Sequence, residues 1–366
     1  MADLTPRAIA WATTMSGHPG EAVVQAHAEP GARLGLQRPI LREQREAWEA
    51  ERLVPGATLA YGAGNRVRPE APDPERTCFE RDRDRIVHST AFRRLAGKTQ
   101  VVVHPTDHQR TRLTHALEVA QVATSIARGV GANVALAEAI ALGHDCGHGP
   151  GGHASEDAFD PFLPEGYDHG PWGADVVLTP LNLCLETLDG IRNHSWSRPT
   201  PATVEGEIVS WADRIAYCAH DLEDAVGAGI VALADVPDAV VEVAGATRRE
   251  QLSIFVREVI GTAVATGEIG MSAPVAAALA ELRSFNYERI YTRPESLAQS
   301  AAVIAVLQAL VSFYLENPGR LPEPPDDPDR LVHATVAYVG GMTDRFAFDT
   351  AVQLLGWDPA RLPRPQ

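Results

Sequence analysis

The chain has 366 residues, and 32 Lys and Arg against 48 Asp and Glu give it a net charge of −16. This acidic balance argues against a general nucleic-acid binder and against adhesion to anionic lipids, because both normally need a basic surface. Hydrophobic residues make up 45% and charged residues 22%, which is typical of a globular protein with a sizeable core.

The charge is unevenly distributed along the chain. Residues 76–128 hold ten basic and five acidic side chains, so this basic segment is locally positive inside an acidic protein. Such a segment indicates either a site for an anion or a solvated charged helix face. The charge count alone leaves both interpretations open.

The cysteines and the hydropathy pattern bear on the compartment. Four cysteines lie far apart without a C-x-x-C pair, which predicts reduced thiols: Cys78, Cys146, Cys184 and Cys218. We find no basic stretch followed by an apolar run at the N-terminus, and no run of about 18 uncharged apolar residues. We therefore expect a cytoplasmic protein with no membrane partner.

In chain order, the composition predicts an N-terminal arm over 1–40, partly disordered, a charged helix over 41–53 and a loop over 54–76. Val101–Val103 is the one strand-like run of note. Helices are expected over 113–128, with C-cap signals at Gly129 and Gly131, and from Asn133 to Leu142. Further helices are expected over 204–227, 249–266, 274–288, 297–316, 330–339 and 344–356. The fold class is therefore all-α. No G-x-G-x-x-G turn follows a strand and no P-loop is present, so neither nucleotide-binding signature is available.

Ten of the thirteen histidines lie between residues 88 and 220. The densest part is His144-Asp145-Cys-Gly-His148-Gly-Pro-Gly-Gly-His153-Ala-Ser-Glu156. A lone helical His is more often structural than a ligand, but this density together with Asp indicates a metal or acid–base site. His144 and Asp145 at a helix end, with His115 from the helix before and Asp213 from the helix after, would form a mixed N/O site.

A second pair, His220-Asp221, competes for the ligand role. Asp213, Tyr217 and Asp221 are spaced four residues apart and share one helix stripe. Asp213 would then bind the metal, while Tyr217 and Asp221 face a substrate. The alternative is an exposed acidic face, since Glu223 and Asp224 follow.

Four ordered motifs make the chain similar to the deoxyguanosine-triphosphate triphosphohydrolase-like family of the HD superfamily. They are RDRDRIVHSTAFRRLAGKTQV (81–101), RTRLTHALEVAQVA (110–123), AIALGHDCGHGPGGHASE (139–156) and EIVSWADRIAYCAHDLEDAV (207–226). LRSFNYERIY (282–291) resembles a later family segment. The resemblance covers the chain from about residue 42 and implies an HD helical bundle over 41–230, with additional C-terminal helices over 231–366 packed on it.

The resemblance also implies residue roles. It implies one divalent metal (Mn, Mg, Fe, Ni, Co or Zn) on His115, His144, Asp145 and Asp213, a catalytic His153 and its carboxylate partner Glu156. Substrate contacts are implied for Gln100, Arg112, His148, His169, Tyr217, Asp221, Arg283 and Tyr291. The family turn before the catalytic His usually holds an aromatic residue, whereas this chain has Gly151 and Gly152 there. Because Gly adds backbone freedom, we expect a looser turn.

The implied reaction is hydrolysis of a deoxynucleoside triphosphate, dGTP or several dNTPs, to the deoxynucleoside and inorganic triphosphate. The alternatives are an HD phosphohydrolase for a different or modified nucleotide, and a non-catalytic nucleotide-sensing protein. A homo-oligomer and an allosteric second nucleotide are also expected from the family. General nucleic-acid binding is not expected.

Overall fold

The computed structural model describes residues 4–20, 22–29, 31, 34–35, 38–101 and 109–363. They belong to two units, Met1–Ile40 and Leu41–Gln366. The first unit contains the helix α1 (Pro6–Thr14) and a short antiparallel pair, β1 (His18–Pro19) and β2 (Val24–Gln25). The sequence predicted none of these three elements.

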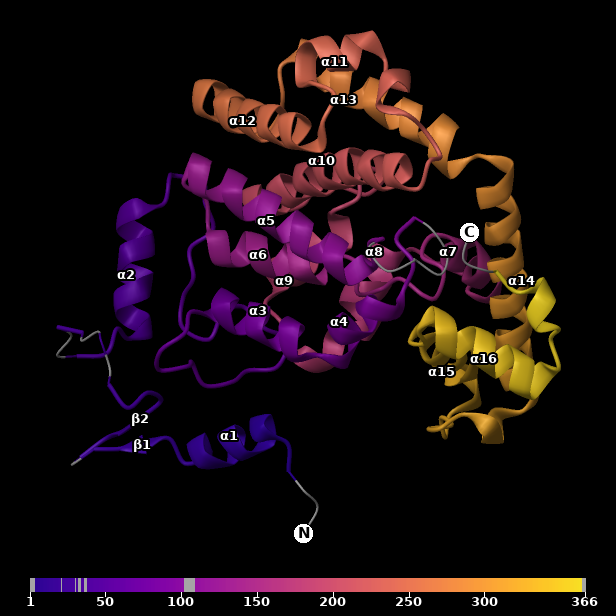
Figure 1. Cartoon of the computed structure of the whole chain (residues 1–366), viewed down its shortest axis with the longest axis horizontal. Helices are drawn as coiled ribbons and strands as arrows, with labels where there is room; N and C mark the ends of the chain where they lie inside the picture. Colours follow the sequence, from indigo (N-terminus) through magenta and orange to yellow (C-terminus); the bar gives the residue numbers. More distant parts are fainter. Residues whose placement is uncertain are drawn as a thin grey trace. The chain divides into compact units, whose positions relative to one another are not determined.

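The second unit is built from helices, and no sheet is found in its described residues, so the all-α prediction is confirmed (Figure 1). Its α-helices are α2 (Arg42–Arg52), α3 (Cys78–His88), α4 (Thr90–Arg94), α5 (Arg112–Val130), α6 (Val134–Gly143), α7 (Ala154–Phe159), α8 (His169–Trp172), α9 (Leu185–Asn193), α10 (Val204–Gly227), α11 (Asp238–Ala244), α12 (Arg248–Thr266), α13 (Ala273–Asn286), α14 (Pro294–Glu316), α15 (Leu331–Gly340) and α16 (Asp344–Leu355). The division of this unit at residue 230 stays a prediction.

Local signals account for the ends of the predicted helices. The Asn133 side chain accepts hydrogen bonds from the backbone N–H groups of Ala135 and Leu136, which caps α6. Gly131 ends α5 in the left-handed conformation, with φ of 79°. The segment expected over 274–288 instead ends as α13 at Asn286 and continues as a π-helix, η6 (Tyr287–Tyr291). Val101 is not in a strand, and the rest of the strand-like run lies outside the described residues.

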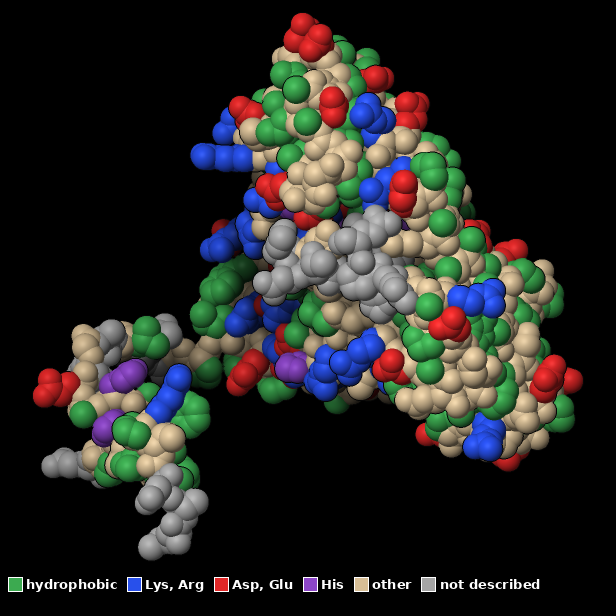
Figure 2. Space-filling model, turned by 45° about the vertical axis from the view of Figure 1, so that its right-hand side comes forward, with side chains coloured by type: hydrophobic (Ala, Val, Ile, Leu, Met, Phe, Trp, Pro, Cys, Tyr) green, Lys and Arg blue, Asp and Glu red, His purple; other side chains and the backbone are tan. Residues whose placement is uncertain are grey.

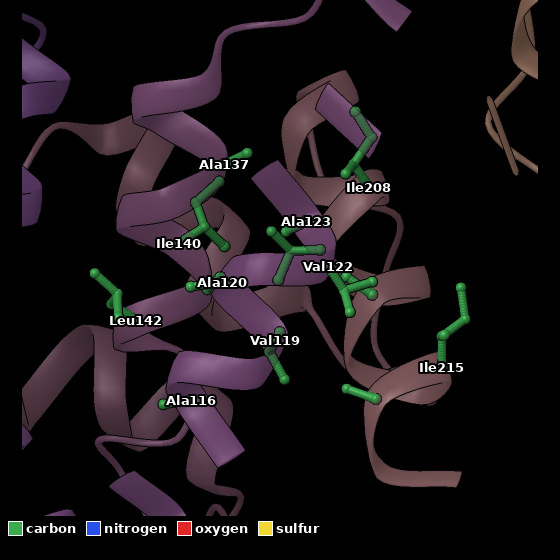
Figure 3. Close-up of a cluster of buried hydrophobic side chains, with 14 of the residues drawn as sticks. Ala116, Val119, Ala120, Val122, Ala123, Ala137, Ile140, Leu142, Ile208 and Ile215 are labelled. Atoms are coloured by element: carbon green, nitrogen blue, oxygen red, sulfur yellow. The ribbon is translucent and has the colours of Figure 1, made fainter. Parts of the chain in front are cut away.

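The main core lies between α5, α6 and α10, whose small and branched side chains interlock (Figure 3). The labelled members are Ala116, Val119, Ala120, Val122, Ala123, Ala137, Ile140, Leu142, Ile208 and Ile215. Alanines on α5 let the neighbouring helices approach closely, because a methyl group leaves room for the facing branched side chains. This packing sets the relative positions of the three helices that carry the densest His and Asp motifs.

One described helix, α14, is long and apolar enough to cross a membrane by length and composition. This finding corrects the expectation that no such run exists. Core helices of soluble proteins pass the same test. Val303, Leu307 and Leu310 of α14 lie in a second buried cluster with residues of α7, α15 and α16.

A buried ion pair anchors α3 to the start of α9. Arg66 Nη1 lies 2.6 Å from Asp82 Oδ1, and both side chains are at most 1% exposed. Asp82 Oδ2 also accepts hydrogen bonds of 2.8 Å from the Cys184 backbone N–H and the Thr187 hydroxyl. Removing Asp82 would leave the buried Arg66 with only the partly exposed Glu70 as an acidic partner, and the buried Cys184 N–H and Thr187 hydroxyl without an acceptor.

We therefore expect Asp82→Ala to lower the free energy of unfolding by about 3–5 kcal/mol. Asp84→Ala is the matched control on the same helix. The partly exposed ion pairs of Asp84 with Arg76 and Arg83 are worth about 0–1 kcal/mol. Urea denaturation of the two variants checks this, and equal midpoints would contradict it.

Candidate active site

A cavity of about 440 Å³ opens between α5, α10, α13 and the turn that follows α6. Twelve of the fourteen predicted site residues line it: Gln100, Arg112, His115, Asp145, His148, His153, His169, Asp213, Tyr217, Asp221, Arg283 and Tyr291. The other two, His144 and Glu156, lie directly behind this lining, in contact with Asp145 and His153 respectively. The fold thus brings all fourteen side chains to one place.

Four nitrogen and oxygen donors from three segments converge at the base of this cavity. His115 on α5 places Nε2 3.0 Å from Oδ1 of Asp213 on α10. His144, which follows α6, places Nε2 3.7 Å from the same oxygen and 3.4 Å from Asp145 Oδ1. His115 Nε2 lies 4.0 Å from Asp145 Oδ2. His115, His144 and Asp145 form a mixed N/O donor group suited to a divalent cation, and Asp213 belongs to a second such group that shares His144.

The tautomer of His144 fits a ligand role. Its Nδ1–H donates a hydrogen bond of 2.6 Å to the Ala141 carbonyl, so Nε2 keeps its lone pair. Nε2 is buried and has no hydrogen-bond partner. An outer hydrogen bond that fixes the ring and aims the free nitrogen is the usual environment of a metal-ligating His. The residues present therefore fit a divalent metal.

The carboxylates of this set are held in their charged form. Burial alone would raise the pKa of Asp145, but Arg112, whose Nη1 donates a hydrogen bond of 2.8 Å to it, and His144 hold that pKa well below its usual range. For Asp213, burial is likewise outweighed by His115 and His144, and its pKa is lowered. Both therefore stay anionic at neutral pH, as metal ligands must.

A second set of imidazoles surrounds Glu156 on α7. His153 Nδ1 lies 3.3 Å from Glu156 Oε2, and His169 Nδ1 hydrogen-bonds to Oε1. Burial alone would raise the pKa of Glu156, but these two bonds hold it well below its usual range. Burial alone would lower the pKa of His169, but the bond to Glu156 raises it. The His153 side chain is 70% exposed, so its ring is accessible from the cavity.

The glycine turn before His153 is closely held, which differs from the looser turn expected. Gly151 and Gly152 have φ of 74° and 63°, a region that favours glycine. A Cβ on Gly151 would lie 2.4 Å from Val303 Cγ1, and one on Gly152 would lie 2.5 Å from Arg112 Nη2. A side chain at Gly151 would collide with α14, and one at Gly152 would collide with Arg112. The aromatic residue that is usual in the family turn would therefore not fit at this turn.

The far side of the cavity carries the Tyr217 and Asp221 stripe of α10. Tyr217 Oη accepts a hydrogen bond of 2.9 Å from Arg283 Nε on α13. Asp221 forms an ion pair with Arg110 and accepts a hydrogen bond from the Tyr291 hydroxyl. The exposed-face alternative for this stripe is wrong, because Asp221 is only 3% exposed. His220 points elsewhere, with Nδ1 donating to the Ala216 carbonyl at 2.7 Å.

Sequence reasoning missed several residues of the site. His194, at the end of α9, places Nε2 3.1 Å from His169 Nε2 and lies within 4.8 Å of the donor atoms of His144 and Asp213. Arg110 pairs with Asp221, Asp224 and Glu118. The density of histidines was a signal for His194, whereas no local pattern singled out Arg110.

The basic segment 76–128 contributes less to the cavity than its charge suggests. Arg112 is its one arginine that lines the cavity among the described residues. Arg81 and Arg85 pair with Glu70, and Arg76 and Arg83 pair with Asp84. Figure 2 shows Lys and Arg side chains interspersed with Asp and Glu on the visible face rather than gathered in one basic area.

Comparisons with known proteins agree with this geometry. The HD domain model matches residues 112–218, and the phosphohydrolase-associated domain model matches residues 269–353. A protein of Caldanaerobacter subterraneus subsp. tengcongensis, named deoxyguanosinetriphosphate triphosphohydrolase-like, is 37% identical over 338 residues, which cover 89% of this chain and 97% of that protein. A protein of the same name from Desulfatibacillum aliphaticivorans is 40% identical over 299 residues, covering 76% and 84%.

Among solved structures, a phosphohydrolase from Bacteroides thetaiotaomicron aligns over 75% of this chain and 68% of that one, at 17% identity and a TM-score of 0.49. The fold and the matched domains define a hydrolase of the HD-domain phosphohydrolase class. Within it, the chain belongs to the deoxyguanosinetriphosphate triphosphohydrolase-like family.

Proposed function

We propose that this protein hydrolyses deoxynucleoside triphosphates, dGTP or several dNTPs, to the deoxynucleoside and inorganic triphosphate, with one divalent metal. The observation that carries the proposal is the convergence of two sets of side chains on one cavity. One set is the mixed N/O donor group of His115, His144, Asp145 and Asp213, and the other is the His153–Glu156 pair.

The four donors would hold the metal, which is Mn, Mg, Fe, Ni, Co or Zn by the chemistry of the set. When bound, such a cation supplies Lewis-acid polarisation of a phosphoryl oxygen and lowers the pKa of water. Water attacks the α-phosphorus, and the bond from this phosphorus to the 5′ oxygen breaks.

His153 acts as the general acid in this step. As imidazolium it donates a proton from Nε2 to the departing 5′ oxygen, while Glu156 accepts from Nδ1 and fixes the ring. Glu156 also holds His169 in the pocket, so one carboxylate orients two imidazoles. The uncharged leaving nucleoside then needs no further stabilisation.

Arg112 and Arg283 supply positive charge for the phosphates. The Nε and Nη2 atoms of Arg112 are buried without a hydrogen-bond partner, which leaves two donors beside the cavity. Charge-assisted hydrogen bonds of this kind stabilise negative charge that grows on phosphoryl oxygens. Burial and the charge of Arg112 lower the pKa of His148, so this His is a neutral contact for the phosphates.

The deoxyribose is assigned to the wall formed by Gln100, Tyr217, Asp221 and Tyr291. The Tyr217 ring would pack where a ribose 2′-hydroxyl would otherwise lie, so a ribonucleotide would clash or bury an unpaired hydroxyl. Asp221, oriented by Arg110 and Tyr291, would accept from the 3′-hydroxyl. A second activating nucleotide and a homo-oligomer stay predictions of the family resemblance, and a cytoplasmic location stays a prediction from the cysteines and the hydropathy pattern.

Incubation with each dNTP and with GTP, in Mn or Mg, followed by chromatography of the products, tests the proposal. We expect deoxynucleoside and intact triphosphate, and GTP turnover about 5- to 150-fold below dGTP, since one unpaired buried hydroxyl costs about 1–3 kcal/mol. Release of pyrophosphate or orthophosphate would contradict the cleavage site. Equal rates on GTP and dGTP would contradict the role of Tyr217.

A further inference from the structure

Asp344, the first residue of α16, is buried in contact with two segments that line the cavity. Its side chain accepts hydrogen bonds from the Thr99 backbone N–H at 2.9 Å, from the Thr99 hydroxyl and from the Gly151 backbone N–H at 2.8 Å. The residue is 4% exposed. One carboxylate thus joins segments 193 and 245 residues away in the chain.

Each of these two segments carries a side chain of the proposed reaction. Thr99 immediately precedes Gln100, and Gly151 lies two residues before His153. Both Gln100 and His153 line the cavity. A displacement of either hydrogen-bonded backbone group would therefore move a group that faces the substrate.

Two further observations show that the C-terminal helices pack closely against these two segments. Lys98 Nζ donates hydrogen bonds to the His148 carbonyl and, at 2.9 Å, to the Gly340 carbonyl at the end of α15, which ties the same turn to the C-terminal helices. A Cβ on Gly97 would lie 2.7 Å from Thr343 Cγ2. The start of α16 therefore lies directly against both cavity segments.

We propose that Asp344 is a positioning residue. It fixes the Gly151 turn and the Thr99 segment relative to each other, so that His153 and Gln100 face the same substrate. This inference rests on the proposed function for its kinetic consequence. Asp344 does not touch the metal donors, so metal binding does not depend on it. The C-terminal helices thereby take part in the geometry of the site.

The partners of Asp344 require an acceptor at each of its two carboxylate oxygens. Two backbone N–H groups and one hydroxyl donate to it, so it must offer acceptors on both oxygens. An Asn of the same size offers one acceptor oxygen, and its NH₂ group would oppose one of the two N–H donors. Asp344→Asn therefore breaks at least one bond while conserving the side-chain volume.

The test compares Asp344→Asn and Thr99→Val with Asp349→Asn, an exposed position on the same helix, in full-length metal-loaded protein. Steady-state rates are normalised to metal content and folded fraction. We expect kcat of Asp344→Asn to fall about 10- to 100-fold with metal content unchanged, because a displacement of about 1 Å costs up to about 10²-fold. Thr99→Val should raise KM more than it lowers kcat, because the bond to Gly151 persists, and Asp349→Asn should match the unmodified protein.

Hydrogen–deuterium exchange separates this proposal from the proposed function. In Asp344→Asn the amides of Thr99 and Gly151 should exchange faster than in Asp349→Asn, whether or not a dNTP is the substrate. If the unmodified protein turns over no dNTP but this exchange difference is seen, the proposed function is wrong and the positioning role of Asp344 is supported. Normalised kcat within twofold of the unmodified protein, or unchanged exchange at both amides, would overturn the positioning role.

Discussion

Asp145→Ala is expected to purify without its divalent metal and to lose dNTP hydrolysis by about 10³-fold or more. A metal supplies several kcal/mol of charge stabilisation in the transition state, and each ~1.4 kcal/mol is worth a factor of ten. Asp145 is central to the donor set, because its two oxygens lie 3.4 Å from His144 Nε2 and 4.0 Å from His115 Nε2. Elemental analysis of the purified variant measures the metal directly.

Asp175→Ala is the matched control for this variant, since Asp175 is exposed and pairs with Arg192 away from the cavity. Asp145→Ala also leaves the buried Arg112 without its carboxylate partner, so the folded fraction must be measured beside the metal. Asp145→Asn keeps the side-chain shape and should also lose most of the metal, because the ligand charge is gone. Full metal occupancy in both variants would refute the assignment of Asp145 as a ligand.

His153→Ala is expected to keep its metal and to lose activity by about 10²–10⁴-fold, the usual contribution of a positioned general acid. His153 contacts Glu156 and belongs to a different donor group from His115, His144 and Asp145, so its removal leaves the metal donors in place. Steady-state kinetics with dGTP, with elemental analysis of the same preparation, check both halves of this prediction.

The control for His153→Ala is His88→Ala, an exposed His at the end of α3. It should behave as the unmodified protein. Turnover of His153→Ala close to that of the unmodified protein would remove this residue from the mechanism. Loss of metal together with activity would instead assign His153 to the ligands.

Most helices of the second unit were predictable, because their signals are local. The expected helices over 204–227 and 249–266 correspond to α10 and α12, whose apolar residues recur every three or four positions. The short α7, α8 and α9 were not distinguished, since helices of four to nine residues hold too few turns for such a period. The π-helix η6 after Asn286 was not predicted, since the apolar pattern over 274–288 indicated a continuous α-helix.

The basic segment shows the limit of charge counting. Its net charge suggested an anion site, and one member, Arg112, does line the cavity. Arg85 and Arg83 instead pair with Glu70 and Glu138, acids that lie outside the counted window. Pairing partners come from three dimensions, so a window of sequence overstates the charge available to a ligand.

By itself, the sequence determined the class of fold, the family and the kinds of side chain at the site. Helix periodicity, caps and the spacing of the His and Asp motifs are short-range properties that a sequence displays directly. Only the tertiary structure decided which distant groups support those motifs: Asp344 under Gly151, Arg110 beside Asp221 and His194 against His169. These contacts join residues 25 to 193 positions apart, and a hydrogen bond between distant elements leaves no period in the sequence.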